Sequence, residues 1–206
     1  MGGHALKINT VRKTTYEYNK IQSIIVPILK DRLDTDIQIV KCYHTKTSHG
    51  DMDVLIKIDN KFYNKNINLV DFIKNTFNPN DIYNNGGVIS FDYENFQIDF
   101  IPIKESNWNF AVKWFAYDPF SNITGKIAHK KGLKFGWNGL IYPFRNFNGR
   151  LSTDILISMD HKKSLEFLGY DYDRYLLGFD TLQDIFDYIV TSKYFLRFMN
   201  DGLTVF

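Results

Sequence analysis

The stretch GDMDVLIKI, residues 50–58, determines how one half of this chain folds. Apolar residues at positions 52, 54, 56 and 58 recur with a period of two, which predicts a β-strand with one face in a core. Asp51 and Asp53 occupy the alternate positions, so both side chains point to the other face. The sequence therefore predicts a strand that presents two carboxylates on one face and buries its apolar side chains on the other.

A second apolar stretch, FQIDFIPI at residues 96–103, carries the next conspicuous carboxylate, Asp99. Together with residues 88–93 it is typical of a β-hairpin turning at Glu94 and Asn95. An ionised carboxylate in so apolar a strand is costly unless it is paired or metal-bound. A buried salt bridge from Asp99 to a lysine or arginine is the structural alternative to a metal.

Three carboxylates brought together would repel one another, and divalent cations that favour oxygen ligands relieve that repulsion. We therefore predict Asp51, Asp53 and Asp99 as catalytic residues and as ligands of two Mg²⁺ or Mn²⁺ ions, the arrangement used in two-metal phosphoryl transfer. His44, His49 and His129 are further candidate ligands, although an isolated histidine is more often structural or solvated.

The remaining pattern predicts an α+β protein of two parts. Thr14 and Glu17 form a possible capping box before a helix that Pro27 should kink or split. Residues 37–43 read as a strand, and 66–77, 106–117 and 122–131 as helices, the last ended by Gly132. Beyond it, short apolar segments alternate with Gly, Asn and Pro, and helices are expected at 160–168 and 181–190. We predict residues 1–118 to be a mixed sheet with helices on one side, and residues 119–206 to be a smaller α+β unit.

Composition narrows the class of protein. The 206 residues are 44% hydrophobic and 23% charged, which suits a globular chain with a real core. The single cysteine, Cys42, excludes an internal disulfide and a cysteine-based zinc cage. No apolar run approaches the ~20 residues of a membrane helix, and no signal peptide is visible. We expect a soluble, cytoplasmic protein with no membrane partner, a monomer rather than an oligomer; its abundant Asn, Ile and Lys suit an AT-rich viral or phage genome.

The net charge of +2 conceals an uneven distribution of charge. Between Ser121 and Arg150 there is no acidic residue, and aromatic residues alternate with the basic ones. Such a stretch favours binding to a polyanion that carries bases, whereas the alternative is a solvated basic face over core aromatics. We predict that nucleic acid contacts the following side chains: Lys126, His129, Lys130, Lys131, Lys134 and Arg145.

The order of these features resembles the polymerase-beta nucleotidyltransferase superfamily, and family X DNA polymerases most closely. Residues 50–56 resemble the family's Asp-X-Asp strand and residues 97–101 its third-aspartate strand. Trp114-Phe115, Asn122 and the stretch HKKG at 129–132 are similar to its nucleotide-binding region and basic helix. Residues 158–169 and 184–189 are similar to its C-terminal patterns, so the resemblance covers roughly residues 36–195.

The resemblance implies a palm domain at 1–118 and a thumb-like subdomain at 119–206, as in small viral polymerases of this family. It implies that Asp51 and Asp53 bind both metals, and that Asp99 binds the catalytic metal and faces an attacking 3′-hydroxyl. Ser48, Gly50, Asn122 and Lys126 would contact an incoming NTP or dNTP. The product would be an extended nucleic acid, DNA rather than RNA, in a reaction suited to DNA repair.

The chain departs from the family pattern in three places. The Gly-Ser pair that normally precedes the aspartates is missing, and residues 46–49, or alternatively Gly2 and Gly3, are the candidates to replace its amide groups. The family's Tyr-Phe-Thr-Gly turn reads WFAY at 114–117, which leaves sugar selection open. No lyase or helix-hairpin-helix domain precedes Asp51.

Three other functions remain open from the sequence. One is transfer of a nucleotide to a tRNA, a small molecule or a protein hydroxyl. Another is a non-catalytic nucleic-acid-binding module, which retention of all three carboxylates disfavours, and the last is a purely structural domain.

Overall fold

The computed structural model describes residues 3–195, which divide into two compact units. The first unit contains residues 3–40 and 46–108, and the second contains residues 41–45 and 109–195. Each unit has a hydrophobic core of its own. The prediction of an α+β protein with a mixed sheet is confirmed.

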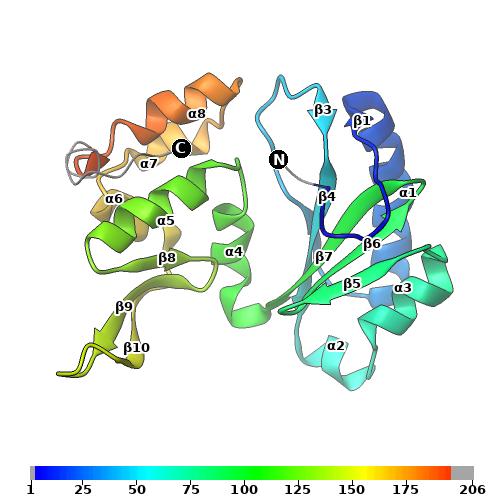
Figure 1. Ribbon diagram of the computed structural model, residues 1–206, viewed down its shortest axis with the longest axis horizontal. Helices are drawn as coiled ribbons and strands as arrows, with labels where there is room; N and C mark the ends of the chain where they lie inside the picture. The colour runs from blue at the N-terminus through cyan, green and yellow to red at the C-terminus, as the bar shows by residue number, and fades with distance from the viewer. Residues whose placement is uncertain (1–2, 196–206) are drawn as a thin grey trace. The chain divides into compact units, whose positions relative to one another are not determined.

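A five-stranded sheet forms the centre of the first unit (Figure 1). Its strand order is β2 (Ile37–Ile39), β4 (Asp51–Ile58), β7 (Phe96–Lys104), β6 (Val88–Tyr93) and β5 (Ile82–Asn85). Strands β4 and β7 run parallel and the other neighbours are antiparallel, so the sheet is mixed. A separate short ribbon pairs β1 (Lys13–Thr14) with β3 (Ser48–His49), directly before Asp51.

One face of this sheet is covered by helices α1 (Thr15–Leu33) and α3 (Leu69–Phe77). The apolar residues of β4 at 52, 54, 56 and 58 belong to the core that these helices close, as their alternation predicted. The capping box of Thr14 and Glu17 is present at the start of α1. Pro27 does not split the helix, which runs as one element to Leu33. The carboxylates of β4 consequently lie on the face opposite α1 and α3.

Local turn chemistry sets the remaining elements of the first unit. Glu94 and Asn95, with φ of 51° and 58°, form the two-residue turn between β6 and β7, in the left-handed conformation that tight hairpins use. Helix α2 (Asn60–Asn64) and the 3₁₀ turn η1 (Glu105–Asn107) complete this unit. The strand expected at 37–43 is shorter, since it ends at Ile39.

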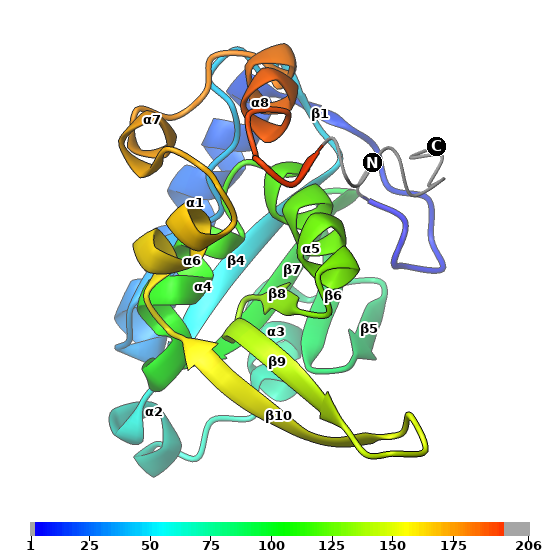
Figure 2. The ribbon, with the colours of Figure 1, turned by 90° about the vertical axis from the view of Figure 1, so that its left-hand side faces the viewer.

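The second unit combines five helices with a three-stranded antiparallel sheet (Figure 2). The helices are α4 (Trp108–Trp114), α5 (Phe120–Lys130), α6 (His161–Phe167), α7 (Tyr172–Leu176) and α8 (Leu182–Ile189). The strands are β8 (Lys134–Gly136), β9 (Gly139–Arg145) and β10 (Leu151–Ser158), and β9 with β10 forms a long hairpin. Helix α5 ends at Lys130, and Gly132 follows with a φ of +72°, as expected for a helix stop.

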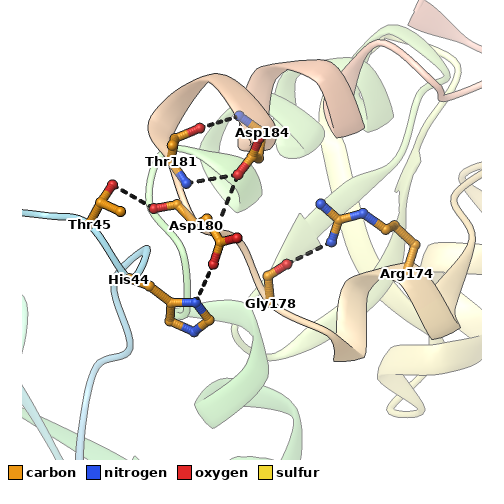
Figure 3. A network of polar contacts seen from close by, with 7 residues as sticks. All are labelled: His44, Thr45, Arg174, Gly178, Asp180, Thr181 and Asp184. Carbon is orange, nitrogen blue, oxygen red and sulfur yellow. Dashed lines mark hydrogen bonds and ion pairs between the residues drawn. The ribbon is translucent and has the colours of Figure 1, made fainter.

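Residues 41–45 belong to the second unit because they bond to the segment before α8 (Figure 3). The amides of His44 and Thr45 donate to the carbonyls of Phe179 and Asp180, each at 2.9 Å. The His44 Nδ1 lies 2.7 Å from a carboxylate oxygen of Asp180, and the Thr45 hydroxyl donates to the Asp180 carbonyl. The second unit therefore consists of residues 109–195 together with this short segment.

No helix within residues 3–195 has the length and apolar character needed to cross a membrane.

Candidate carboxylate site

The parallel pairing of β4 with β7 brings the three predicted aspartates together on one face of the sheet. Asp53 is the direct register partner of Asp99, and Asp51 is the partner of Gln97. Register partners in neighbouring strands share a face, and residues two apart on one strand share it as well. Asp51, Asp53 and Asp99 therefore occupy a common face, with neighbouring strands about 4.8 Å apart.

Buried polar residues surround Asp99 on this face. Ser90 of β6 is its register partner on the other side, and its hydroxyl donates a hydrogen bond to the Asp99 carboxylate. The Gln97 side-chain amide donates to both carboxylate oxygens of Asp99, each at 3.0 Å. Ser90, Gln97 and Asp99 are 4%, 2% and 8% exposed, so this polar group is part of the interior of the unit.

Burial raises the pKa of Asp99 above its usual value. The hydrogen bonds from Ser90 and Gln97 act in the opposite direction, and the negative charge of Asp51 adds to the increase. The influence of Asp51 shows that the two carboxylates interact electrostatically across the strand pair. No lysine or arginine among the described residues forms an ion pair with Asp99, which disfavours the salt-bridge alternative for this side chain.

The donor set has the chemistry of a site for hard divalent cations, because all three side chains are carboxylates. Within residues 3–195, no group of three or more His, Cys, Asp or Glu side chains is gathered closely enough to hold a metal ion. Ligation by all three aspartates would therefore require their side chains to rotate toward one another on fixed backbone positions. The register of β4 and β7 fixes the backbone positions of the three aspartates. Their side-chain rotamers determine how close the carboxylates come to one another.

The loop that precedes Asp51 contains the residues predicted to contact a nucleotide, Ser48 and Gly50. The Arg12 guanidinium donates to the Ser48 hydroxyl and to the Ser48 carbonyl, both at 2.9 Å. This arrangement holds the exposed Arg12 guanidinium beside the segment that precedes Asp51. Of the alternative pair, Gly2 lies outside the described residues, and the Gly3 amide donates to Asp51 Oδ2 at 3.2 Å.

The three histidines considered as ligands have other surroundings. His49 is buried and stacks on Tyr18 with ring centroids 4.1 Å apart, and burial together with the charges of Lys46 and Arg12 lowers its pKa to about 4. His44 pairs with Asp180 in the second unit, and His129 is exposed on α5. None of the three belongs to the carboxylate face.

The residues predicted to contact nucleic acid all lie in the second unit. Lys126, His129 and Lys130 are exposed on α5, while the Lys131 ammonium lies 5.0 Å from the centre of the Tyr194 ring. Lys134 pairs with Asp154 at 2.8 Å, so part of its charge is neutralised from outside the window. The last of the six, Arg145, donates to the Gly149 carbonyl. Asn122, predicted to contact the nucleotide, lies on the same helix as Lys126 and donates to Asp118.

The aromatic residues of the basic window are mostly on the surface. Of the five between 121 and 150, only Phe135 is buried, whereas Trp137, Tyr142, Phe144 and Phe147 are 38–97% exposed. Tyr142 and Phe144 are two apart on β9 and therefore share a face of the hairpin. The alternative in which these aromatics are core residues holds for Phe135 and not for the other four.

Sequence reasoning missed three residues of the site, Arg12, Ser90 and Gln97. Alternation does predict that Gln97, two positions away on the same strand, shares the face of Asp99, but it assigns Gln97 no role in the site. Arg12 carries no local signal, since it reaches Ser48 from a distant segment. Ser90 follows from the predicted hairpin, whose turn at Glu94 and Asn95 places it opposite Asp99. Compared with known protein families and with curated proteins, the chain matches no family model and no curated protein significantly.

Proposed function

We propose that the chain is a metal-dependent nucleotidyltransferase of the polymerase-beta type, which adds a nucleoside monophosphate to a nucleic-acid 3′-hydroxyl. The observation that supports this best is the parallel register of β4 and β7, which aligns Asp53 with Asp99 and leaves Asp51 on the same face. The sheet would then be the palm, and the second unit would act as the thumb. NTP or dNTP would be the donor.

Each carboxylate has a distinct part in this proposal. Asp51 and Asp53 would hold two Mg²⁺ or Mn²⁺ ions, and Asp99 would hold the catalytic ion and face the attacking hydroxyl. When bound, the ions would polarise the α-phosphate and neutralise the departing pyrophosphate. Arg12, fixed to Ser48 by two hydrogen bonds, offers positive charge to the triphosphate in place of the family's Gly-Ser amides.

The second unit supplies the features expected of a nucleic-acid-binding surface. Exposed lysines on α5 suit the phosphate backbone, which dominates affinity for nucleic acid. Exposed Tyr142 and Phe144 share one face of the β9–β10 hairpin and offer flat rings on which unpaired bases stack. A nucleic-acid acceptor therefore fits this chain better than a small molecule or a protein hydroxyl.

The proposal is tested with a panel of acceptors. The protein is incubated with Mg²⁺ or Mn²⁺ and each NTP and dNTP on single-stranded, primed, gapped and tRNA substrates, and product length is measured. Extension of a DNA 3′ end supports the proposal. Transfer only to tRNA or to a non-nucleic acceptor would support the alternative transferases, and absence of transfer to any acceptor would leave the binding module.

The decisive variant is Asp99→Asn, which removes a charge and keeps the shape. Transfer should fall by about a thousandfold or more, equivalent to about 4 kcal/mol. The Mn²⁺-induced rise in melting temperature should shrink. The metal-free protein should still fold, because the reduced repulsion with Asp51 offsets the loss of one hydrogen-bond acceptor. If Asp99 served a hidden salt bridge instead, the variant would lose about 3–5 kcal/mol of stability.

Asp92→Asn is a matched control on the same sheet. The Asp92 carboxylate is 2% exposed and accepts from the Asp81 amide and the Asn80 side chain, each at 2.8 Å. Its amide replacement loses one acceptor and should cost stability, but it should leave the Mn²⁺ shift unchanged. Equal Mn²⁺ shifts in Asp99→Asn and wild type, with transfer retained, would contradict the metal assignment.

A further inference from the structure

The N-terminal strap, which we define as residues 3–10, lies against the carboxylate face within the first unit (Figure 1, dark blue). Its Gly3 amide donates to Asp51 Oδ2 at 3.2 Å, and its Ala5 amide donates to Gln97 Oε1 at 2.9 Å. The Thr10 hydroxyl closes the strap by donating to the Gly3 carbonyl at 2.7 Å. Two backbone amides of one short segment therefore reach two side chains of the same face.

Glycine is required at position 3. Its φ of +87° is a conformation that L side chains rarely adopt, and a Cβ there would lie 2.4 Å from the Gly50 carbonyl oxygen. Glycine at position 3 thus lets the strap approach the backbone next to Asp51 more closely than a residue with a Cβ would. This close approach fixes where its following amides lie.

The oxygen and the nitrogen of the Gln97 side chain contact different hydrogen-bond partners. The Ala5 amide can only donate, so the Gln97 oxygen must face the strap. The Gln97 nitrogen then faces Asp99, where it donates to both carboxylate oxygens at 3.0 Å. With 2% exposure the side chain has no competing water-facing orientation. The strap amide and the Asp99 carboxylate therefore both favour this orientation of Gln97.

The neutral side-chain amide of Gln97 is well suited to contact the Asp99 carboxylate. It orients the carboxylate and satisfies part of its hydrogen-bonding capacity, as partners of metal-ligating side chains commonly do. A lysine or arginine would cancel the charge that a cation requires, whereas glutamine leaves it. One Asp99 oxygen accepts from both Gln97 and Ser90, and the other retains a second lone pair for a ligand.

We propose that Gln97 is the positioning residue for Asp99 in the metal site, and that the N-terminal strap holds Gln97 in its working orientation through the Ala5 amide. This inference rests on the proposed function of the carboxylate face. It assigns to residues 3–10 a role in metal affinity that acts through a backbone amide.

The first test is Gln97→Met, which keeps the length of the side chain and removes its amide. Mn²⁺ binding is measured on the otherwise unchanged protein by electron paramagnetic resonance of the free ion. We expect affinity to fall by about tenfold or more, the usual effect of losing such a partner. Gln38→Met, in edge strand β2 of the same sheet, is the control and should bind Mn²⁺ as wild type does.

The second test leaves every side chain of the site in place. Ala5→Pro removes the amide hydrogen that holds Gln97 Oε1, whereas Ala5→Ser retains it. We expect a severalfold loss of Mn²⁺ affinity in the proline variant and none in the serine variant. The exposure of Ala5 makes this pair informative even if Gln97→Met fails to fold.

The outcomes separate the inference from the function on which it rests. If wild type binds no Mn²⁺, the metal site itself is wrong, and with it the role of Gln97. If Asp99→Asn loses Mn²⁺ but Gln97→Met and Ala5→Pro bind it normally, the metal site stands and the positioning role is overturned. Loss in both variants, with both controls normal, supports the inference.

Discussion

His161 should make the stability of this protein depend on pH. It is the first residue of α6, its side chain is 3% exposed, and its ring lies 5.2 Å from that of Phe110 and 5.0 Å from that of Tyr175. Neither ring nitrogen has a hydrogen-bond partner among the described residues. Burial, assisted by the charge of Lys113 and opposed by that of Asp160, lowers its pKa to about 3.

The sign of the effect follows from this depressed pKa. As pH falls below about 6.5, the ordinary pKa of histidine, His161 binds a proton in the unfolded chain. In the folded chain it stays neutral until pH approaches its lowered pKa. Between these limits stability falls by about 1.4 kcal/mol per pH unit. At pH 5 the loss from this one group is about 2 kcal/mol relative to pH 8.

The assay is urea unfolding followed by circular dichroism at pH 7.5, 6 and 5. His161→Phe keeps an aromatic ring in the cluster and removes the titration, so it should be less sensitive to pH than wild type by about 2 kcal/mol at pH 5. His129→Gln, on the exposed surface of α5, is the control and should keep the wild-type slope. Identical slopes in wild type and His161→Phe would refute the reasoning, and His161→Leu provides a second variant if the first folds poorly.

Three further predictions concern nucleic acid and the hairpin. Replacing Lys126, Lys130 and Lys131 together by Ala should weaken nucleic-acid binding and flatten its salt dependence, because fewer counterions are released; an unchanged slope in a salt titration would show a merely solvated face. Because the described residues form two units and no third one that would hold a 5′-phosphate, a 5′-phosphorylated gap should be preferred over a plain primer–template by less than about tenfold, or 1.4 kcal/mol, in competition binding. Gly139→Ala places a Cβ 2.7 Å from the Ser158 carbonyl oxygen at a φ of +112°, and should cost about 2 kcal/mol in urea unfolding. Gly132→Ala has a positive φ but open space around it, so it should cost less.

Much of the local structure could be predicted because it depends on residues close together in the chain. The strand at 51–58, the hairpin turn at Glu94 and Asn95, and the capping box at Thr14 were each predicted correctly from periodicity or turn chemistry. Short elements without a periodic pattern were not predicted, such as β5 and α7. Pro27 was expected to kink or split the helix, and it does not split it, since α1 runs as one element from Thr15 to Leu33.

The candidate site divides in the same way. Alternation placed Asp51 and Asp53 on one face, and the apolar residues around Asp99 singled it out as a costly carboxylate. Their association required a parallel pairing between strands about 45 residues apart, a non-local contact that no local pattern specifies. The buried hydrogen bonds from Gln97 and Ser90 to Asp99 arise instead within β7 and the β6–β7 hairpin.

The sequence by itself therefore determined which residues of one strand share a face of the sheet, because side chains alternate in direction along a strand. Only the tertiary structure decided that Asp53 lies beside Asp99, that residues 3–10 reach Gln97, and that residues 41–45 join the second unit. Each of these depends on closing a loop between distant segments. The free energy of such a closure comes from burial of the whole core, which no short stretch of sequence encodes.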